Sequence, residues 1–378
     1  MKIALICPSS LPCPPIRSGA IELLVDRIAP HLSRLGGQVV VFSIQDPLLP
    51  SVEKINGVDF VRYPKDNYIH DVLSHLNKEY FDLIQVFNNQ EWIEPIKRTS
   101  PASRLILSLH NLRLGYTTDD VRSIQIIKTV DQLVTVSRFV AQDIIHRYPL
   151  AVGKTTVLYT GEDPARYVPH DSQEGKKVKE RLRGELGIPN EYPIVLYAGR
   201  LVKFKGCHLL IEAMKEVKKQ YPRVALVIVG SKWYGEVEIT PYIEALIKDA
   251  REVGDVYFKH FIPANDMPPY YIMSDIFVCP SQWEEPLARV HYEAMAASLP
   301  IITTNRGGNA EVINPGKNGL VIDRYDQPSA FAQAIIQLLQ YPLLCEKMGR
   351  NNRDLVEKKY NFQQYSQQLF GLYKKIQS

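Results

Sequence analysis

Two cations in the second half of the chain have the spacing to hold a phosphate group. Arg200 and Lys205 lie in a turn between the apolar run Ile194–Ala198 and the helix-period segment Cys207–Lys219. A helix N-terminus and nearby cations both favour a bound anion. A diphosphate gains negative charge as its bond to a sugar breaks, so we expect both side chains to act mainly in the transition state. For this fragment alone, the alternative is a pair of surface cations on a turn.

Two glutamates after the apolar run Ile276–Cys279 have a spacing that suits an extended ligand. Pro286 fits the first turn of a helix, so Glu285 precedes that helix and Glu293 lies up to about 12 Å along it. One carboxylate would accept hydroxyl hydrogens from a hexose and the other from a ribose, with the backbone amides between them facing a diphosphate. Carboxylates for acid and base catalysis would converge on one bond, so we interpret these as positioning groups. The alternative is ordinary acidic residues near a helix start.

The elements that must position these residues follow an α/β pattern, because short apolar runs alternate with helix-period segments. The first unit is a strand at Lys2–Cys7, a loop at Pro8–Ser18 and a helix at Ala20–Leu35. Further strands are predicted, in order, at Val39–Phe42, Leu83–Phe87, Leu105–Leu109, Gln132–Val136, Thr156–Tyr159, Ile194–Ala198, Ala225–Val229, Val256–Phe258, Ile276–Cys279 and Ile301–Thr303. The sequence therefore predicts two doubly wound, Rossmann-like domains that face each other across a cleft, where ligands bind at the carboxyl ends of the strands.

Composition and length limit the function classes. A length of 378 residues fits two domains, and 45% apolar with 23% charged residues is ordinary for a globular protein. The net charge of +4 does not indicate a nucleic-acid partner. Five cysteines without a CxxC pair argue against a disulfide framework or zinc knuckle and favour a reducing compartment. The apolar run Ile3–Cys7 is too short for a signal peptide, so we expect a cytoplasmic protein.

Common nucleotide and hydrolase motifs are missing from the sequence. The spacing Gly230 to Gly235 resembles a P-loop but continues Glu236-Val237, and no GxGxxG follows a predicted strand. Ser137 has no GxSxG context, and the pairs His70 with His75 and His260 with His291 lack metal-ligand spacing. Trp233 and Tyr234 are candidates for stacking on an acceptor or nucleotide, with loop packing as the alternative.

The predicted boundaries are residues 1–170 and 171–360, with a helical tail over 361–378. Pro169–Pro189 carries five basic residues, Lys176, Lys177, Lys179, Arg181 and Arg183, and we interpret it as a solvated connector helix rather than a phosphate or membrane contact. In the tail, Phe362, Tyr365, Phe370 and Tyr373 have helical spacing, so this helix should pack against another part of the chain.

The ordered motifs resemble the family 4 retaining glycosyltransferases of GT-B fold, closest to a subgroup associated with bacterial spore coats. The resemblance spans nearly the whole chain. Its landmarks are Ser18-Gly19, His110-Asn111, Val134–Ser137, Gly199-Arg200, Lys205-Gly206, Glu285 with Glu293, Arg306-Gly307-Gly308 with Glu311, and Asn318-Gly319. It implies transfer of a hexose from a nucleotide-diphosphate sugar to a glycan, lipid-linked or small-molecule acceptor, in surface or spore-coat polysaccharide synthesis. It also implies retained anomeric configuration and no bound metal or other cofactor, which agrees with the missing DxD motif.

The resemblance also assigns site residues in the second domain. Arg200 and Lys205 would hold the diphosphate, Glu285 the donor sugar and Glu293 the ribose. The residues that would offer backbone amides to the phosphate and sugar are Leu287, Ala288, Arg289 and Val290. The nucleotide base would lie near Phe261-Ile262, and a UDP-sugar is the favoured donor, with GDP- and ADP-sugars as alternatives.

In the first domain, Gly19 would allow close approach to the same phosphate, because it lacks a Cβ atom. His110 would contact a hydroxyl of the transferred sugar, or else be a hydrogen-bonded core histidine. The loop Asn88–Trp92 would face the acceptor. The tail would cross back to this domain, and association with a membrane surface or the spore coat is a further expectation.

Four positions depart from the family pattern, and they keep two other functions open. The family often has glycine where this chain has Ser18, Ala288 and Ser298, and asparagine where it has Thr160. The methyl group of Ala288 would crowd the donor, alter donor choice or weaken the enzyme. The alternatives are a non-catalytic or weakly active coat or scaffold protein that binds sugar nucleotides, and a sugar-nucleotide epimerase or hydrolase on the same fold.

Overall fold

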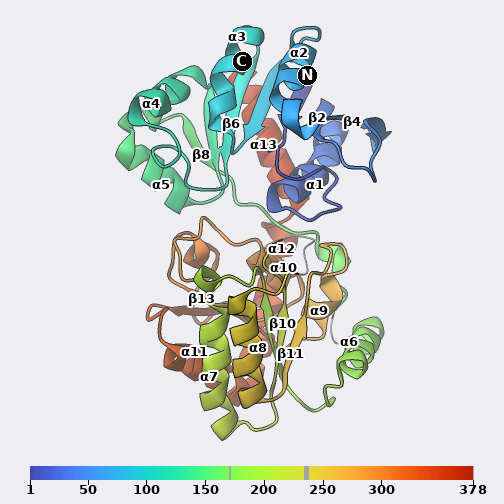
Figure 1. Cartoon of the computed structure of the whole chain (residues 1–378), viewed down its shortest axis with the longest axis vertical. Coiled ribbons are helices and arrows are strands. Elements are labelled where there is room, and N and C mark those ends of the chain that lie inside the picture. Colours follow the sequence, from blue (N-terminus) through green and yellow to red (C-terminus); the bar gives the residue numbers. More distant parts are fainter. Residues whose placement is uncertain (170–171, 234–237, 378) are drawn as a thin grey trace. The chain divides into compact units, whose positions relative to one another are not determined.

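The computed structural model describes residues 1–169, 172–233 and 238–377, and the chain forms two compact units (Figure 1). The first unit comprises Met1–Thr160 with Phe362–Ser378, and the second comprises Gly161–Asn361. The chain therefore leaves the first unit at residue 160, where the sequence analysis predicts 170. The candidate stacking residue Tyr234 and Gly235 of the P-loop-like spacing lie outside the described residues.

The described part of the first unit contains an eight-stranded sheet in the order β3-β4-β2-β1-β5-β6-β7-β8. Each neighbouring pair is parallel except β3 with β4. The strands are β1 (Lys2–Ile6), β2 (Gln38–Ile44), β3 (Val52–Ile55), β4 (Val58–Tyr63), β5 (Leu83–Phe87), β6 (Arg104–Leu109), β7 (Gln132–Thr135) and β8 (Thr155–Val157). The carboxyl ends of β1, β5 and β6 are adjacent, so the loops that follow them share one edge of this sheet.

The hairpin of β3 and β4 is missing from the sequence prediction. Strand β3 is largely exposed, so it lacks the apolar alternation of a half-buried strand. Its turn is Asn56-Gly57, with φ angles of 51° and 80°. Asn-Gly between two extended runs is a strong signal for a two-residue hairpin, and it could have identified this element.

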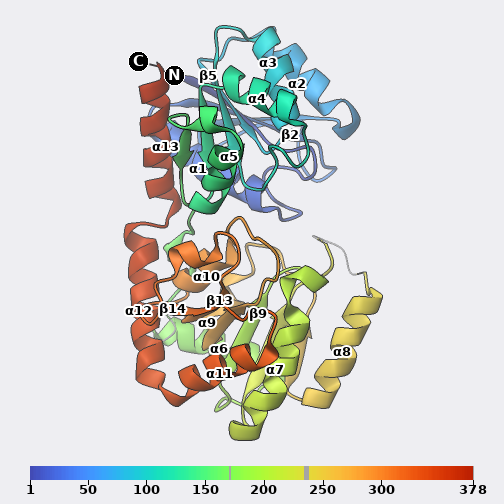
Figure 2. The ribbon, with the colours of Figure 1, turned by 90° about the vertical axis from the view of Figure 1, so that its left-hand side faces the viewer.

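Helices complete the first unit, and its last helix comes from the end of the chain. They are α1 (Ala20–Arg34), α2 (Tyr68–Leu76), α3 (Ile93–Thr99), α4 (Asp120–Thr129), α5 (Arg138–Arg147) and α13 (Phe362–Gln377). Helix α13 packs against α1 (Figure 2) and buries the predicted apolar face that includes Phe362, Tyr365 and Phe370. The hydroxyl of Tyr373 on the same face donates a hydrogen bond to Gln85 in β5.

The described part of the second unit contains a parallel six-stranded sheet in the order β11-β10-β9-β12-β13-β14. Its strands are β9 (Ile194–Ala198), β10 (Ala225–Val229), β11 (Val256–Lys259), β12 (Ile276–Cys279), β13 (Ile301–Thr304) and β14 (Gly319–Ile322). Its helices are α6 (Gln173–Leu186), α7 (Cys207–Gln220), α8 (Pro241–Val253), α9 (Pro268–Ile272), α10 (Val290–Ala296), α11 (Pro328–Gln340) and α12 (Pro342–Lys358). Strand β14 is missing from the prediction; it begins at a glycine, and its Leu320 and Val321 are only half-buried.

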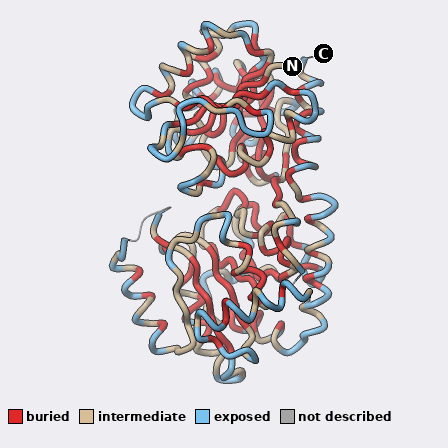
Figure 3. The backbone as a smooth tube through the Cα atoms, turned by 90° about the vertical axis from the view of Figure 1, so that its right-hand side faces the viewer, coloured by how far each residue is buried: buried red, intermediate tan, exposed pale blue. Residues whose placement is uncertain are grey.

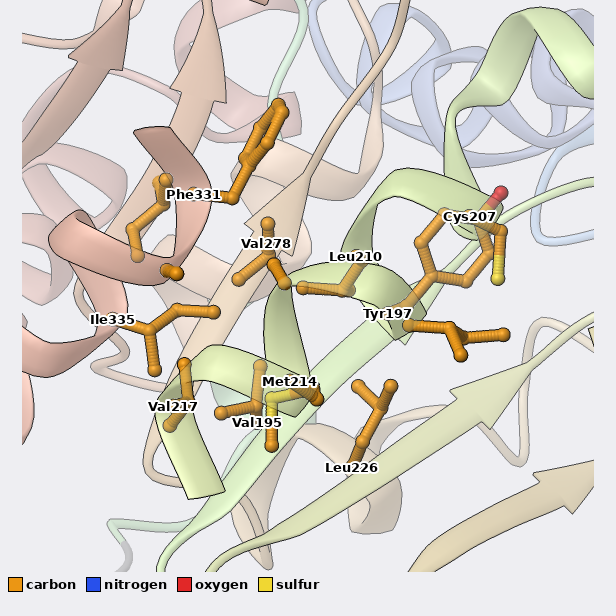
Figure 4. Close-up of a cluster of buried hydrophobic side chains, with 14 of the residues drawn as sticks. Val195, Tyr197, Cys207, Leu210, Met214, Val217, Leu226, Val278, Phe331 and Ile335 are labelled. Atoms are coloured by element: carbon orange, nitrogen blue, oxygen red, sulfur yellow. The ribbon is translucent and has the colours of Figure 1, made fainter. Parts of the chain in front are cut away.

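The core of the second unit lies between this sheet and the helices α7, α8 and α11. Figure 4 shows Val195 of β9 and Val278 of β12 on the face that meets Leu210 of α7 and Ile335 of α11. The buried segments follow the strands in both units (Figure 3). No helix within the three described stretches is both apolar and long enough for a membrane span.

Helix α6 corrects the interpretation of Pro169–Pro189 as a solvated connector. It belongs to the second unit and packs against α9. Arg183 near its end is 2% exposed, donates hydrogen bonds to the carbonyls of Pro189, Asn190 and Tyr192, and forms an ion pair with Asp275 at 3.1 Å. The sequence of a basic cluster does not show which of its residues will be buried, so Arg183 could not be told from its exposed neighbours.

Candidate active site

The turn after β9 and the loop after β12 are bound to each other, which fixes the residues that both carry. The backbone amide of Gln282 donates to the carbonyl of Phe204 at 2.8 Å. Gly206 has a φ angle of 76°, and a Cβ atom there would lie 1.9 Å from the carbonyl oxygen of Pro280. Only glycine permits this backbone conformation and approach without strain. The close contact brings Lys205 to the loop that contains Glu285.

Glu285 and Lys205 form an ion pair in which the carboxylate is held on one side. Lys205 Nζ, Ser281 Oγ at 3.0 Å and Trp283 Nε1 at 2.6 Å all donate to the Oε2 atom of Glu285. The glutamate is only 7% exposed. Every hydrogen bond that the described residues make to this carboxylate ends on Oε2, so Oε1 keeps its capacity to accept a hydroxyl hydrogen from a ligand.

These contacts decide the charge of Glu285. Burial by itself raises the pKa of this carboxyl, but the Lys205 ammonium and the three hydrogen bonds outweigh it, so the pKa lies below its ordinary value. Glu285 is therefore ionised at neutral pH. An ionised carboxylate accepts stronger hydrogen bonds from sugar hydroxyls than a neutral acid does.

Arg200, the second predicted cation, is held by aromatic rings rather than by a carboxylate. Its guanidinium lies 5.3 Å from the ring centre of Phe204 and 5.2 Å from that of Trp233. Within the described part of the chain it forms no ion pair with an Asp or Glu side chain. Cation–π contacts orient a guanidinium without neutralising it, so Arg200 keeps its charge for an anionic ligand.

The Gly307-Gly308 turn after β13 supports the backbone of Glu285. Gly307 has a φ angle of 60°, and a Cβ atom there would lie 2.1 Å from the carbonyl oxygen of Glu285. The amide of Gly308 donates to the same carbonyl at 2.7 Å. The amide of Gly307 donates to the Glu284 carboxylate at 2.8 Å, which also pairs with Arg306. The two glycines thus hold the backbone that carries Glu285.

The backbone around Ala288 is already partly engaged by side chains. Its amide, predicted to face a ligand, donates to Asn309 Oδ1 at 3.1 Å. Its carbonyl accepts a hydrogen bond from His291 Nδ1 at 2.8 Å. His291 is fully buried, and burial lowers its pKa to about 4, so it is a neutral core histidine that also contacts Thr303 through Nε2.

Glu293 lies inside helix α10 and is bound by two protein donors. Arg289 Nη2 donates to Oε1 at 2.6 Å, and the hydroxyl of Tyr271 donates to Oε2 at 2.6 Å. The same Arg289 nitrogen also reaches Glu162 Oε2 at 2.8 Å. The sequence analysis includes Arg289 only for its backbone amide, and it misses Glu162 and Tyr271.

The predicted residues of the first unit lie at the edge shared by β1, β5 and β6. His110 directly follows β6, and its amide donates to Asn88 Oδ1 after β5 at 2.8 Å. Burial lowers the pKa of the His110 imidazole to about 4, so it is neutral at pH 7. Gly19 precedes α1 and has a φ angle of 117°.

Glu22, which the sequence analysis misses, occupies the space beside Gly19. A Cβ atom on Gly19 would lie 2.3 Å from Glu22 Oε2, so the room predicted for a phosphate holds this carboxyl group. Glu22 is 3% exposed, and burial raises its pKa to about 7. A buried carboxyl with a shifted pKa is a signal that only the folded chain reveals.

Of the predicted residues of the second unit, the structure brings Lys205 and Glu285 into contact, while Arg200 lies in the same turn as Lys205 and Glu293 is bound by Arg289 and Tyr271. Ile262 lies in the loop after β11, at the same carboxyl edge of the sheet. Across residues 1–169, 172–233 and 238–377, no three His, Cys, Asp or Glu side chains gather as a metal site would require.

Two family profiles match this chain. Residues 21–166 match "Glycosyltransferase Family 4", and residues 178–355 match "Glycosyl transferases group 1". "Spore coat protein SA" of Bacillus subtilis (strain 168) is 42% identical over 99% of this chain and 100% of its own length. The chain belongs to glycosyltransferase family 4. A family 4 glycosyltransferase transfers sugar from a nucleotide sugar, and the predicted membership is confirmed.

Further relatives agree with the family and the fold. "Putative glycosyltransferase YtcC" of the same bacterium is 40% identical over 100% of this chain and 92% of its own length. The structure of Anabaena Alr3699/HepE in complex with UDP-glucose matches with a TM-score of 0.79 and 21% identity, covering 99% of this chain and 100% of that one. This family 4 glycosyltransferase therefore has the predicted α/β fold of GT-B type, with two parallel-sheet, Rossmann-like units.

Proposed function

We propose that this protein is a retaining hexosyltransferase whose second unit binds a UDP-sugar. The observation that carries the proposal is the pair of cations after β9 beside the ionised Glu285. Lys205 and Glu285 are bound to each other, and Arg200 pairs with no carboxylate of residues 1–169, 172–233 and 238–377. Cations of this kind stabilise a diphosphate whose charge grows as it leaves. Anabaena Alr3699/HepE, a structural neighbour, is described in complex with UDP-glucose, which supports UDP as the nucleotide.

In this proposal each charged residue of the second unit has one task. Arg200 and Lys205 bind the diphosphate, Glu285 accepts a hydroxyl hydrogen of the hexose on Oε1, and Glu293 accepts those of the ribose. Backbone amides at the start of α10, from Leu287 to Val290, face the phosphate and sugar, although that of Ala288 first has to leave Asn309. The base lies near Ile262.

The first unit then supplies the acceptor side. The acceptor is a glycan, a lipid-linked sugar or a small molecule, and the loop Asn88–Trp92 contacts it. His110, as a neutral imidazole, exchanges hydrogen bonds with the transferred sugar. Gly19 approaches the phosphate only if the Glu22 carboxyl, which occupies the space beside it, moves away. Retention of configuration requires the acceptor oxygen to arrive on the face of the sugar from which the diphosphate departs. In this proposal protein cations neutralise the diphosphate, so transfer proceeds without a bound metal ion.

The proposed place of this activity is the synthesis of surface or spore-coat polysaccharide, with association at a membrane surface or the coat. The support is the 42% identity to "Spore coat protein SA". The same relative supports a second candidate function, a coat protein that binds sugar nucleotides and turns them over slowly or not at all. Ala288, where the family often has glycine, is the residue that favours this second candidate.

The experiment has two stages. The melting temperature of the full chain is first measured with UDP-, GDP- and ADP-glucose, because a ligand that binds only the native state raises it. We expect the largest rise with the UDP-sugar, and no rise with any donor would contradict the proposal. The donor that binds is then incubated with glycan and lipid-linked acceptors. Transfer with retained anomeric configuration supports the enzyme, whereas saturable binding without transfer or hydrolysis supports the coat protein.

A further inference from the structure

The side chain of Arg289 belongs to a buried chain of ion pairs that ends at Glu293. From one end to the other, the chain runs Arg166, Glu162, Arg289 and Glu293. The Glu162 side chain is fully buried, while 15% of Arg289 and 12% of Glu293 are exposed. Two cations alternate with two carboxylates, so the chain is neutral. Alternation of this kind offsets the cost of taking each charge out of water.

The contacts of Glu293 fix the plane of its carboxylate. Arg289 donates to Oε1 and Tyr271 donates to Oε2, each at 2.6 Å. A carboxylate has about four acceptor positions, two on each oxygen. The described residues therefore use one position on each oxygen and leave one on each oxygen. Two remaining acceptors on neighbouring oxygens match the two hydroxyl groups of a vicinal diol.

Arg289 is itself anchored from the other side. Its Nη2 atom reaches Glu162 Oε2 at 2.8 Å, and Glu162 Oε1 accepts hydrogen bonds from Arg166 at 3.2 Å and from the amide of Asp163 at 3.0 Å. The guanidinium therefore cannot follow Glu293 if that carboxylate rotates. Opposite charges at this distance attract more strongly in a buried site than in water, so the pair holds Glu293 in one orientation.

We propose that Arg289, with Tyr271, positions Glu293 so that the site selects ribonucleotides over 2′-deoxyribonucleotides. The inference rests on the proposed binding of a nucleotide sugar by the second unit. A ribose offers both hydroxyls to the two remaining acceptor positions, whereas a 2′-deoxyribose fills only one. If Glu293 were free to rotate, it would adjust to a single hydroxyl, and much of the difference between the two sugars would be lost.

The test is calorimetric binding of UDP, GDP and ADP, each beside its 2′-deoxy form, to the full chain. For the nucleotide that binds best, we expect the wild type to prefer the ribose form by at least about tenfold, as loss of a hydrogen bond to a charged group would cause. Arg289→Met should reduce that preference to below about threefold. Tyr271→Phe should change it in the same direction by a smaller factor, and Arg289→Lys should retain part of it.

Arg183→Met is the matched control, because Arg183 is a buried arginine of the same unit that also pairs with a carboxylate, that of Asp275. Asp275 precedes β12, whereas Glu285 follows it, so this pair lies at the opposite edge of the sheet. The control should melt at a lower temperature yet keep the wild-type preference for ribose. If Arg289→Met does not fold, the double variant Glu162→Gln with Arg289→Met removes the buried carboxylate that the single change leaves behind.

A wild type that binds ribose and deoxyribose forms equally overturns the inference, and so does a folded Arg289 variant that keeps the full preference. If Arg289→Met weakens the binding of the ribose and deoxyribose forms equally, Arg289 has a purely structural role, and this result would also overturn the inference. A wild type that binds none of the nucleotides contradicts the proposed function itself. Loss of the preference in the Arg289 variant, with the preference kept by Arg183→Met, supports the inference.

Discussion

The candidate glutamates are charged and ion-paired in the second unit, whereas in the first unit the candidate residues are wholly or partly neutral. In the second unit the carboxylates of Glu285 and Glu293 are each paired with a cation. In the first unit His110 and Glu22 make no ion pair among the described residues, and burial moves the pKa of His110 to about 4 and that of Glu22 to about 7. Both are therefore wholly or partly neutral near pH 7. The candidate residues of the second unit therefore carry fixed charge, whereas those of the first unit are suited to hydrogen bonding as neutral groups.

The most disruptive change is removal of residues 362–378, which include α13, because this helix is part of the first unit. Phe362, Tyr365, Leu369 and Tyr373 are almost fully buried in it. Each such side chain contributes roughly 2 kcal/mol by burial, and their sum of about 8 kcal/mol is comparable with the whole stability of a typical protein. We expect the truncated chain to be insoluble or to melt more than about 10 °C below wild type in calorimetry. A wild-type melting temperature would contradict this packing.

The next largest effect tests the charge of the second unit. Lys205→Ala and Arg200→Ala should each lower kcat by roughly 10² to 10³, because each removes a cation from the departing diphosphate. Lys205→Ala should be the more severe, since it also leaves Glu285 without its ion partner. Steady-state transfer kinetics measure both values. Lys215→Ala, a change in α7 at a side chain that is only 38% exposed and pairs with Glu212, is the control and should leave kcat unchanged.

Glu22→Gln tests the buried carboxyl beside Gly19 in the first unit. The folded-state pKa of Glu22 is raised to about 7, above its ordinary 4.5, so the protonated group stabilises the fold at low pH and that stability is lost between about pH 4.5 and 7. At pH 8 the variant should exceed wild type by about 1 to 3 kcal/mol in free energy of unfolding, a difference that shrinks toward pH 4. Urea unfolding at both pH values measures it. A difference independent of pH would show that the carboxyl titrates normally.

The smallest effects concern the hydrogen bonds that hold Glu285. Trp283→Phe and Ser281→Ala each remove one donor to Oε2, and both donors lower the pKa of Glu285. The acidic limb of the pH–rate profile should therefore shift to higher pH, with kcat at pH 7 reduced by roughly three- to tenfold. Ser281→Thr keeps a hydroxyl and should restore the wild-type profile. An unchanged acidic limb in Trp283→Phe would exclude this role for the indole N–H group.

Sequence patterns predicted most of the buried strands, but they missed the exposed β3 and also β4, whose apolar run is interrupted by Asp59 and Arg62. The bounds of β5, β9, β10 and β12 agree with the prediction, because a parallel strand buried on both faces is a continuous apolar run. Strand β3 lacks that signal because it is largely exposed. The same limit applies to α6, where the pattern identifies the helix but not the burial of Arg183.

The sequence alone determined the alternation of strands and helices, the family, and the order of Arg200, Lys205, Glu285 and Glu293 along the chain. Local periodicity and spacing are enough for these, since each depends on residues close together in sequence. Only the tertiary structure revealed that Lys205 pairs with Glu285 and that Glu162 and Tyr271 bear on Glu293. Those contacts join residues 80, 127 and 22 positions apart, and such partners meet only when strands and loops are packed. The tertiary structure also decided the charge of Glu22, because burial raises the pKa of its carboxyl above the value usual for a glutamate.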